Sequence, residues 1–123
     1  MCMTQHEVNK AYPALMRLSE FRLPVKKARG LYEVTKKAEE HFQFAIAEER
    51  KYIVEFNGQE RPDGTVSFAS PEDFAKYQEK MTELNTLEVD WDITPIVLTE
   101  AEIGEQPISP ADIHSLEGFV TFE

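Results

Sequence analysis

Cysteine is almost absent from this sequence, in which Cys2 is the only one. A single thiol excludes an internal disulfide framework and a cysteine-rich zinc site, and it fits a reducing compartment. Long apolar runs are also missing: none approaches the roughly 20 residues that a transmembrane helix needs, and the first twenty residues lack the apolar centre of a signal peptide. We therefore expect a cytoplasmic protein that is neither secreted by that route nor membrane-spanning.

Basic residues are missing from the last third of the chain. Residues 81–123 contain ten acidic side chains and no Lys or Arg, whereas residues 1–80 contain 13 of each sign, so the formal charge of −10 lies entirely after Lys80. Between Arg17 and Lys37, by contrast, seven bases face two acids. Such asymmetry bears on association and solubility more than on fold.

The length and composition predict one folded domain spanning residues 1–123. A chain of 123 residues has room for a single modest core. Hydrophobic residues at 41% and aromatic residues at 11% are too frequent for a disordered chain.

Capping patterns mark the start of the first two helices. Thr4 and Glu7 form a capping box, which predicts a helix over residues 5–19. Pro13 lies inside it and predicts either a kink or a division into two short helices. Pro24 then suits the first position of a second helix.

The second helix is predicted to be long and amphipathic, ending at Asn57 and Gly58. Its apolar residues recur mostly at steps of three and four between Lys, Glu, Arg and Gln. About 30 residues of helix would be roughly 45 Å long. We assign this stripe mainly to the core and expect part of it to stay uncovered in so small a domain, as a pairing surface. The stripe consists of Val25, Ala28, Leu31, Tyr32, Thr35, Ala38, Phe42, Ala45, Ile46, Ile53 and Phe56.

Shorter elements follow. Asp63-Gly64 predicts a turn before a strand-like stretch at 65–69, and serine–proline pairs at 70–71 and 109–110 predict the starts of two further helices. In the last helix, Ile113 and Leu116 are expected to point inward. Residues 89–93 alternate as in a strand with one buried face. The fold class is therefore α+β and mostly α: a kinked N-terminal helix and one long amphipathic helix, packed with a shorter helix and a small antiparallel sheet.

The order of these elements resembles a family of short uncharacterised proteins of tailed bacteriophages and prophages of Gram-positive bacteria. The resemblance is carried by residues 11–15, 18–20, 23–26, 88–90 and 108–113, and this sequence departs from it by a longer turn-rich segment at 59–69. It implies a phage or prophage origin and an α+β fold, and it implies no activity or catalytic residue.

Residues for catalysis or metal binding do not form a recognisable set. His6, His41 and His114 are each isolated, without the spacing that brings two histidines to one metal. Glu88, Asp90 and Asp92 would share one strand face, where a carboxylate row can bind a divalent cation or serve a metal-dependent hydrolase, but we interpret them as the solvent face of the strand. Ser70 and Ser109 are explained as helix caps, Cys2 is terminal, and the five glycines match no phosphate-binding loop.

The basic residues of the first third have three explanations. They form a solvated face, a partner for the acidic last third within the fold, or such a partner across a dimer. The overall acidity argues against direct nucleic-acid binding, because phosphates would be repelled. These bases are Arg22, Lys26, Lys27, Arg29, Lys36 and Lys37.

Two functional hypotheses follow from the sequence. The first is a phage accessory protein without catalysis or cofactor, which acts by protein contact in virion assembly or as an adaptor and forms a homo-oligomer. The second is an acidic inhibitor whose carboxylates imitate nucleic-acid phosphates and bind a host nucleic-acid-binding or defence protein.

Overall fold

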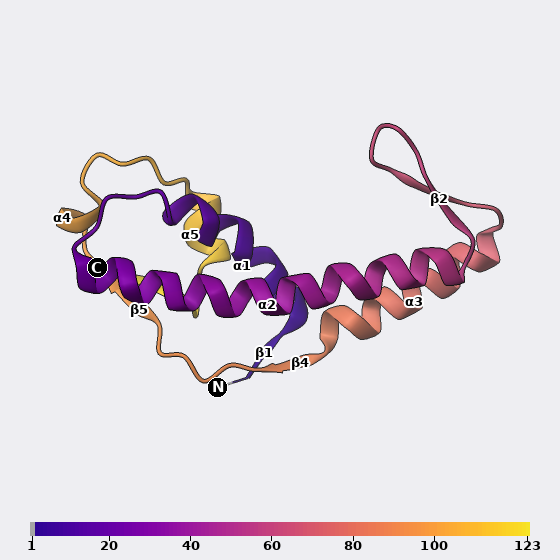
Figure 1. Cartoon of the computed structure of the whole chain (residues 1–123), viewed down its shortest axis with the longest axis horizontal. Helices are drawn as coiled ribbons and strands as arrows, with labels where there is room; N and C mark the ends of the chain where they lie inside the picture. The colour runs from indigo at the N-terminus through magenta and orange to yellow at the C-terminus, as the bar shows by residue number, and fades with distance from the viewer. Residues whose placement is uncertain (1) are drawn as a thin grey trace.

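The long helix α2 (Val25–Glu55) runs the length of the molecule, and the other elements pack along it (Figure 1). The computed structural model describes residues 2–123, with side chains from Met3 onward. Helix α1 (Gln5–Leu18) packs on the N-terminal half of α2. Helix α3 (Pro71–Thr86) returns antiparallel beside its C-terminal half. The mostly helical α+β class is confirmed, and a 31-residue helix replaces the predicted 30.

Six short strands form three separate pairs in the described chain. Antiparallel pairing joins β1 (Cys2–Thr4) to β4 (Glu88–Asp90) and β2 (Gly58–Glu60) to β3 (Val66–Phe68). Strands β5 (Ile96–Leu98) and β6 (Val120–Phe122) are parallel. The sequence led us to expect one small antiparallel sheet; the parallel pair arises because helices α4 (Glu100–Ile103) and α5 (Pro110–Ser115) supply a crossover connection between β5 and β6.

The core lies where α1, the first half of α2 and the C-terminal segments meet. Trp91 and Phe119 are each 1% exposed and pack edge to face, with ring centroids 5.0 Å apart. Together with Leu15 and Leu98, both fully buried, they join residues from the two ends of the chain. The remaining core members are Met3, Val8, Ala11, Ala14, Leu18, Leu31, Val34, Ala38, Leu116 and Val120.

A second apolar contact closes the far end of the molecule. Phe68 of the β2–β3 hairpin packs against Tyr77 and Phe74 of α3, with ring centroids 4.8 and 5.5 Å away. The Tyr77 hydroxyl donates a hydrogen bond of 3.1 Å to Glu49 on α2. Burial and the charge of Glu49 raise the pKa of Tyr77 to about 12. This contact fixes α3 and the hairpin on the C-terminal half of α2.

The predicted caps are confirmed. Thr4 and Glu7 form the capping box of α1, and the hydroxyls of Ser70 and Ser109 accept from the third residue of α3 and α5. Asn57, at φ 60°, takes the left-handed conformation that ends α2. A further capping box at Thr99 starts α4, an element that the sequence analysis did not predict.

Several predictions about single residues were wrong. Of the two outcomes predicted at Pro13, a kink or a division, the division is wrong, because α1 is continuous through the proline with buried residues on both sides of it. Pro24 is the N-cap of α2, one residue before the predicted position. Ile113 is 41% exposed instead of pointing inward, since Leu116 alone fills the core position of that segment.

The apolar stripe of α2 is narrower than predicted. Val25 and Tyr32 belong to the predicted stripe, but they are 86% and 55% exposed. Val34, which was left out of the stripe, is 1% exposed. The buried face follows the contact with α1 and includes Leu31, Val34 and Ala38, whereas Val25 and Tyr32 lie toward solvent.

Candidate interaction surface

Basic side chains of the first third pair with acidic side chains of the last third inside the fold. Arg17 pairs with Asp112, Lys27 Nζ lies 4.0 Å from Glu102 Oε1, and Lys37 Nζ lies 3.8 Å from Asp92 Oδ1. These three contacts join α1 and α2 to α5, α4 and the segment after β4. Of the three explanations for the basic residues, intramolecular pairing therefore holds for Lys27 and Lys37.

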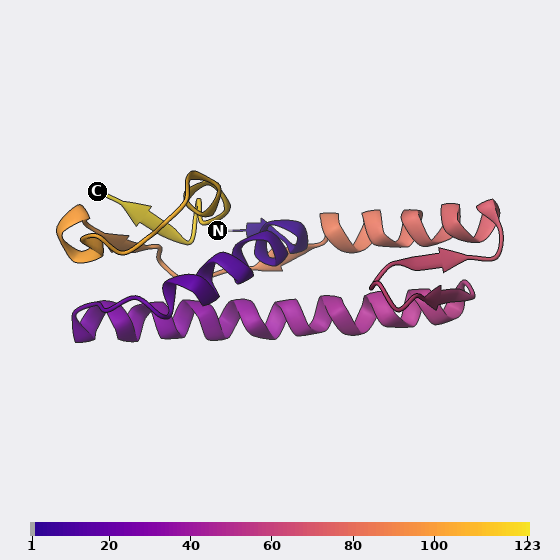
Figure 2. The same ribbon diagram turned by 90° about the horizontal axis from the view of Figure 1, so that it is seen from above.

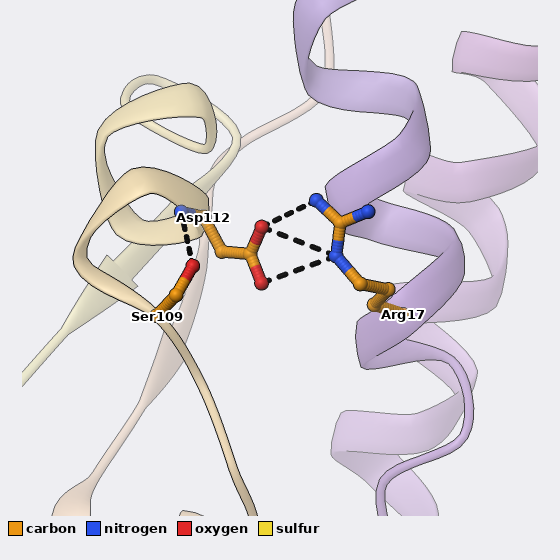
Figure 3. Close-up of polar contacts among 3 residues, drawn as sticks. All are labelled: Arg17, Ser109 and Asp112. Atoms are coloured by element: carbon orange, nitrogen blue, oxygen red, sulfur yellow. Dashed lines mark hydrogen bonds and ion pairs between the residues drawn. The ribbon is translucent and has the colours of Figure 1, made fainter.

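Arg17 and Asp112 form the most closely built of these pairs (Figure 3). Arg17 Nε donates to both carboxylate oxygens at 3.1 Å, and Nη2 donates to Oδ1. The backbone N–H of Asp112 also donates to the Ser109 hydroxyl at 3.1 Å, which places the carboxylate at the start of α5. Hydrogen bonding from Arg17 lowers the pKa of Asp112, and the same hydrogen bond raises the pKa of Arg17.

Backbone contacts strengthen the junction between the two charged regions. Gln106 accepts a 2.6 Å hydrogen bond from the Arg22 N–H and donates one of 3.2 Å to the Arg22 carbonyl. Lys27 Nζ donates to the Val97 carbonyl on β5. The role of Gln106 was not predictable from the sequence, because its partner lies 84 residues away.

No family model, curated protein or solved structure matches this chain.

Within residues 2–123, no element covers one long side of α2. In Figure 2, α1, α3, the hairpin and the C-terminal elements all lie to the same side of α2. Val25 lies on the opposite side, Tyr32 lies at the edge of that side, where it also borders Met16 and Phe21, and Val54 follows about eight whole helical turns after Val25. They are 86%, 55% and 77% exposed. We call this the outer face of α2.

The outer face combines apolar and basic groups. Exposed residues that share it by helical spacing are Arg29, Lys36, Glu40, Gln43, Ala47 and Arg50, so bases outnumber acids on it. The Arg29 guanidinium lies 5.7 Å from the centre of the Tyr32 ring, a cation–π distance. Apolar side chains beside arginine and an exposed tyrosine are typical of the residues that anchor protein interfaces.

The carboxylates singled out in the sequence do not converge. Glu88, Asp90 and Asp92 are all exposed, while Val89 and Trp91 between them are buried. The Asp92 carboxylate is the one that contacts Lys37. Over the described residues, no group of three or more His, Cys, Asp or Glu side chains is placed to hold a metal.

The three histidines lie in different places. His6 and His114 are exposed, and His114 Nδ1 lies 3.8 Å from Glu117. His41 is half-buried beside Trp91, with ring centroids 6.2 Å apart, and its Nε2 has no hydrogen-bond partner in the described chain. Burial and the nearby Lys37 charge lower the pKa of His41, partly offset by Glu40.

The remaining candidates for chemistry have structural roles where they are described. Ser70 and Ser109 cap helices through their hydroxyls. The side chain of Cys2 lies outside the described part of the chain. Among the described residues, no helix combines the length and apolar character needed to cross a membrane.

Proposed function

We propose that this is a phage or prophage protein that acts by protein–protein contact, in virion assembly or as an adaptor, and that it performs no catalysis. The outer face of α2 is the contact surface. Its support is the exposure of Val25, Tyr32 and Val54 on the uncovered side of a helix as long as the molecule.

The charge of the outer face indicates the character of the partner. Arg29, Lys36 and Arg50 lie on it, in a protein whose net charge is −10. Lys36 and Arg50 have no ion pair with any described side chain, whereas Arg29 pairs with Glu33 at 3.2 Å. A surface with apolar anchors and free bases suits an acidic protein surface, including the acidic last third of a second copy.

The test is affinity capture of the tagged protein from host cells during prophage induction, with captured proteins identified by mass spectrometry. A variant carrying both Val25→Glu and Val54→Glu reverses the character of the outer face at two exposed positions, so we expect it to fold and to lose the captured partner. Ile113→Glu, on α5, is a matched control at another exposed apolar position. Sedimentation of each purified protein measures self-association separately.

Recovery of virion or packaging proteins by the wild type and by Ile113→Glu, but not by the double variant, supports an assembly role through this face. If all three proteins recover the same partner in equal amounts, the outer face is not the contact surface. A monomer without any partner would contradict the proposed function itself.

The second candidate function is the acidic inhibitor. It is supported by acidic side chains of the last third that are exposed and have no ion pair with a described residue, among them Glu88, Asp90, Glu100, Glu105 and Glu123. Binding through such carboxylates is screened by salt. A captured polymerase, nuclease or defence protein that is released at high salt would favour this function, and retention at high salt would count against it.

A further inference from the structure

The parallel pair of β5 and β6 uses only alternate backbone groups of β6. The Glu123 N–H, for example, donates to the Leu98 carbonyl at 2.8 Å. Backbone groups along a strand alternate between its two edges, so residues 119, 121 and 123 face β5. Val120 and Phe122 therefore turn their backbone groups to the opposite edge of β6.

Most groups on that opposite edge have no partner among the described residues. The Val120 N–H donates to the Leu116 carbonyl at 2.9 Å, but the Val120 carbonyl and both backbone groups of Phe122 make no hydrogen bond there. The far edge of β5 differs, because Lys27 on α2 donates to the Val97 carbonyl. In Figure 2, β6 lies beyond β5 as seen from α2, and no element is drawn outside it. We call the three unpaired groups the free edge of β6.

The free edge belongs to an incomplete sheet. Two-stranded sheets are marginally stable by themselves, and parallel strands usually belong to larger sheets. Val120 is 4% exposed and Phe122 packs against the core, whereas Thr121 between them is exposed. The strand is thus held by its buried face. Its free edge presents N–H and carbonyl groups in strand geometry, which is a template for an added strand.

Acidic side chains at both ends of β6 indicate which strand fits. Glu117 precedes the strand and Glu123 follows it, and both are exposed. Glu100 lies beside Glu123, because its N–H donates to the Glu123 carbonyl at 2.9 Å. A second copy of this chain would bring its own acids against these, since residues 81–123 contain no Lys or Arg. The complementary occupant is an extended segment with basic ends.

We propose that the free edge of β6 binds an extended segment of a partner protein with Lys or Arg at both ends, which joins β5 and β6 as a third, antiparallel strand. One residue of the segment exchanges two hydrogen bonds with Phe122, and the residue two positions later donates to the Val120 carbonyl. The basic ends face Glu117 and Glu123. This site is separate from the outer face of α2 and does not depend on the proposed assembly role.

The probe is the capped peptide Lys-Thr-Val-Thr-Val-Thr-Lys, titrated into isotope-labelled protein and followed by NMR. Its alternation places Val beside Val120 and Phe122 and Thr beside Thr121. We expect saturable shifts along β6 and slower hydrogen exchange of the Phe122 N–H. A peptide with Glu in place of both Lys should bind at least about tenfold more weakly, because Glu117 and Glu123 repel it. A peptide N-methylated at both Val nitrogens cannot donate to the free edge and should not bind.

Phe122→Pro tests the backbone contact from the protein side. It removes the N–H of the free edge without removing a hydrogen bond to β5, and proline is tolerated on edge strands. We expect it to abolish peptide binding. Phe122→Leu keeps the N–H and an apolar side chain, so this matched control should bind the peptide as the wild type does.

The charge requirement has its own pair of variants. Glu117→Gln combined with Glu123→Gln should weaken binding of the Lys peptide about tenfold and reduce its dependence on salt. Glu88→Gln combined with Asp90→Asn removes two exposed acids from β4 and should leave binding unchanged. The double variant of the outer face should also bind the peptide as the wild type does.

Three results would overturn the strand site: shifts that do not localise to β6, binding that survives N-methylation, or equal affinity for the Lys and Glu peptides. A wild-type dimer in sedimentation that Phe122→Pro converts to a monomer would assign the edge to a second copy and not to a basic partner. If Phe122→Pro does not fold, the N-methylated peptide still decides the question.

Discussion

Arg17 and Asp112 lie 95 residues apart in the sequence, yet Arg17 Nε is 3.1 Å from both carboxylate oxygens of Asp112. The pair joins the last turn of α1 to the first turn of α5 (Figure 3). Arg17 is mostly exposed, at 60% of its side chain, whereas the Asp112 side chain is 14% exposed. The contact therefore positions α5 while one partner stays in water.

Asp112→Asn should lower the midpoint of thermal unfolding by a few degrees at neutral pH, because the charge-assisted contact is lost. The folded-state pKa of Asp112 is lowered, so its contribution is present above the unfolded value near 3.8 and disappears as pH falls through the folded value. Thermal melts across the acid range should thus converge for the two proteins. Lys76→Met removes the exposed Lys76–Glu72 pair and should change little; an equal loss there would show that the Asp112 effect is not specific.

His41 should make the fold less stable in mildly acidic solution. Its folded-state pKa lies below the ordinary 6.5, so below that pH the unfolded chain takes up a proton that the folded chain resists, and stability falls until the folded pKa is passed. His41→Phe keeps a ring beside Trp91 and should remove the loss of stability that protonation of His41 causes. Urea unfolding at about pH 7.5 and 5.5 measures it. Lys37→Met should weaken the pH dependence of the unfolding free energy in part. An unchanged pH dependence in His41→Phe would show that other groups cause it.

Replacing Pro13 by Ala should stabilise the protein by about 1–3 kcal/mol. Pro13 is exposed inside α1 and has no N–H to donate to the carbonyl of Asn9, one turn earlier. Alanine restores that hydrogen bond without disturbing the core. Chemical denaturation measures the gain, with Lys10→Ala on the same helix as a control expected to stay within about 0.5 kcal/mol. A loss of stability in Pro13→Ala would mean that α1 depends on the geometry imposed by the proline.

Replacement by alanine should lower the stability of the protein at Gly58 and raise it at Gly30. A Cβ at Gly58 would lie 2.9 Å from Ile53 Cγ2 and 2.9 Å from the Phe68 ring, so Gly58→Ala should cost about 1–3 kcal/mol. At Gly30, in the second turn of α2, the nearest atoms are 3.7 Å away on Ile96, and alanine should stabilise by about 0.5–1 kcal/mol. Urea unfolding of both variants tests the pair. Equal effects of one sign would show that the close contact at Gly58 is not limiting.

Local features were predictable because their causes are local. The capping boxes and serine caps depend on residues three positions apart, and the end of α2 at Asn57 depends on one backbone conformation. Periodicity also predicted the long helix and the burial of Trp91. The width of the buried stripe on α2 was less predictable, because Val25 and Val34 differ in exposure through their position relative to α1 and not through their hydrophobicity.

The candidate surfaces were also predictable only in part. The uneven distribution of charge was visible in the sequence, but whether a base meets an acid within the fold or faces a partner depends on contacts such as Arg17–Asp112 and Lys27–Glu102. A pocket with Met16 and Phe21 on one side and Leu31 and Tyr32 on the other was not predictable from the sequence, because its walls come from two helices and the segment between them.

By itself, the sequence determined the helices other than α4, the caps of α1, α3 and α5, and the separation of charge along the chain, because these follow from backbone preferences and from side chains a few residues apart. Only the tertiary structure decided that β5 and β6 pair in parallel and that, among the described residues, no element covers one side of α2 and none bonds the Thr35 hydroxyl. Those outcomes depend on how elements that are distant in the sequence pack around one small core. A pattern of neighbouring residues does not specify which of these elements come into contact.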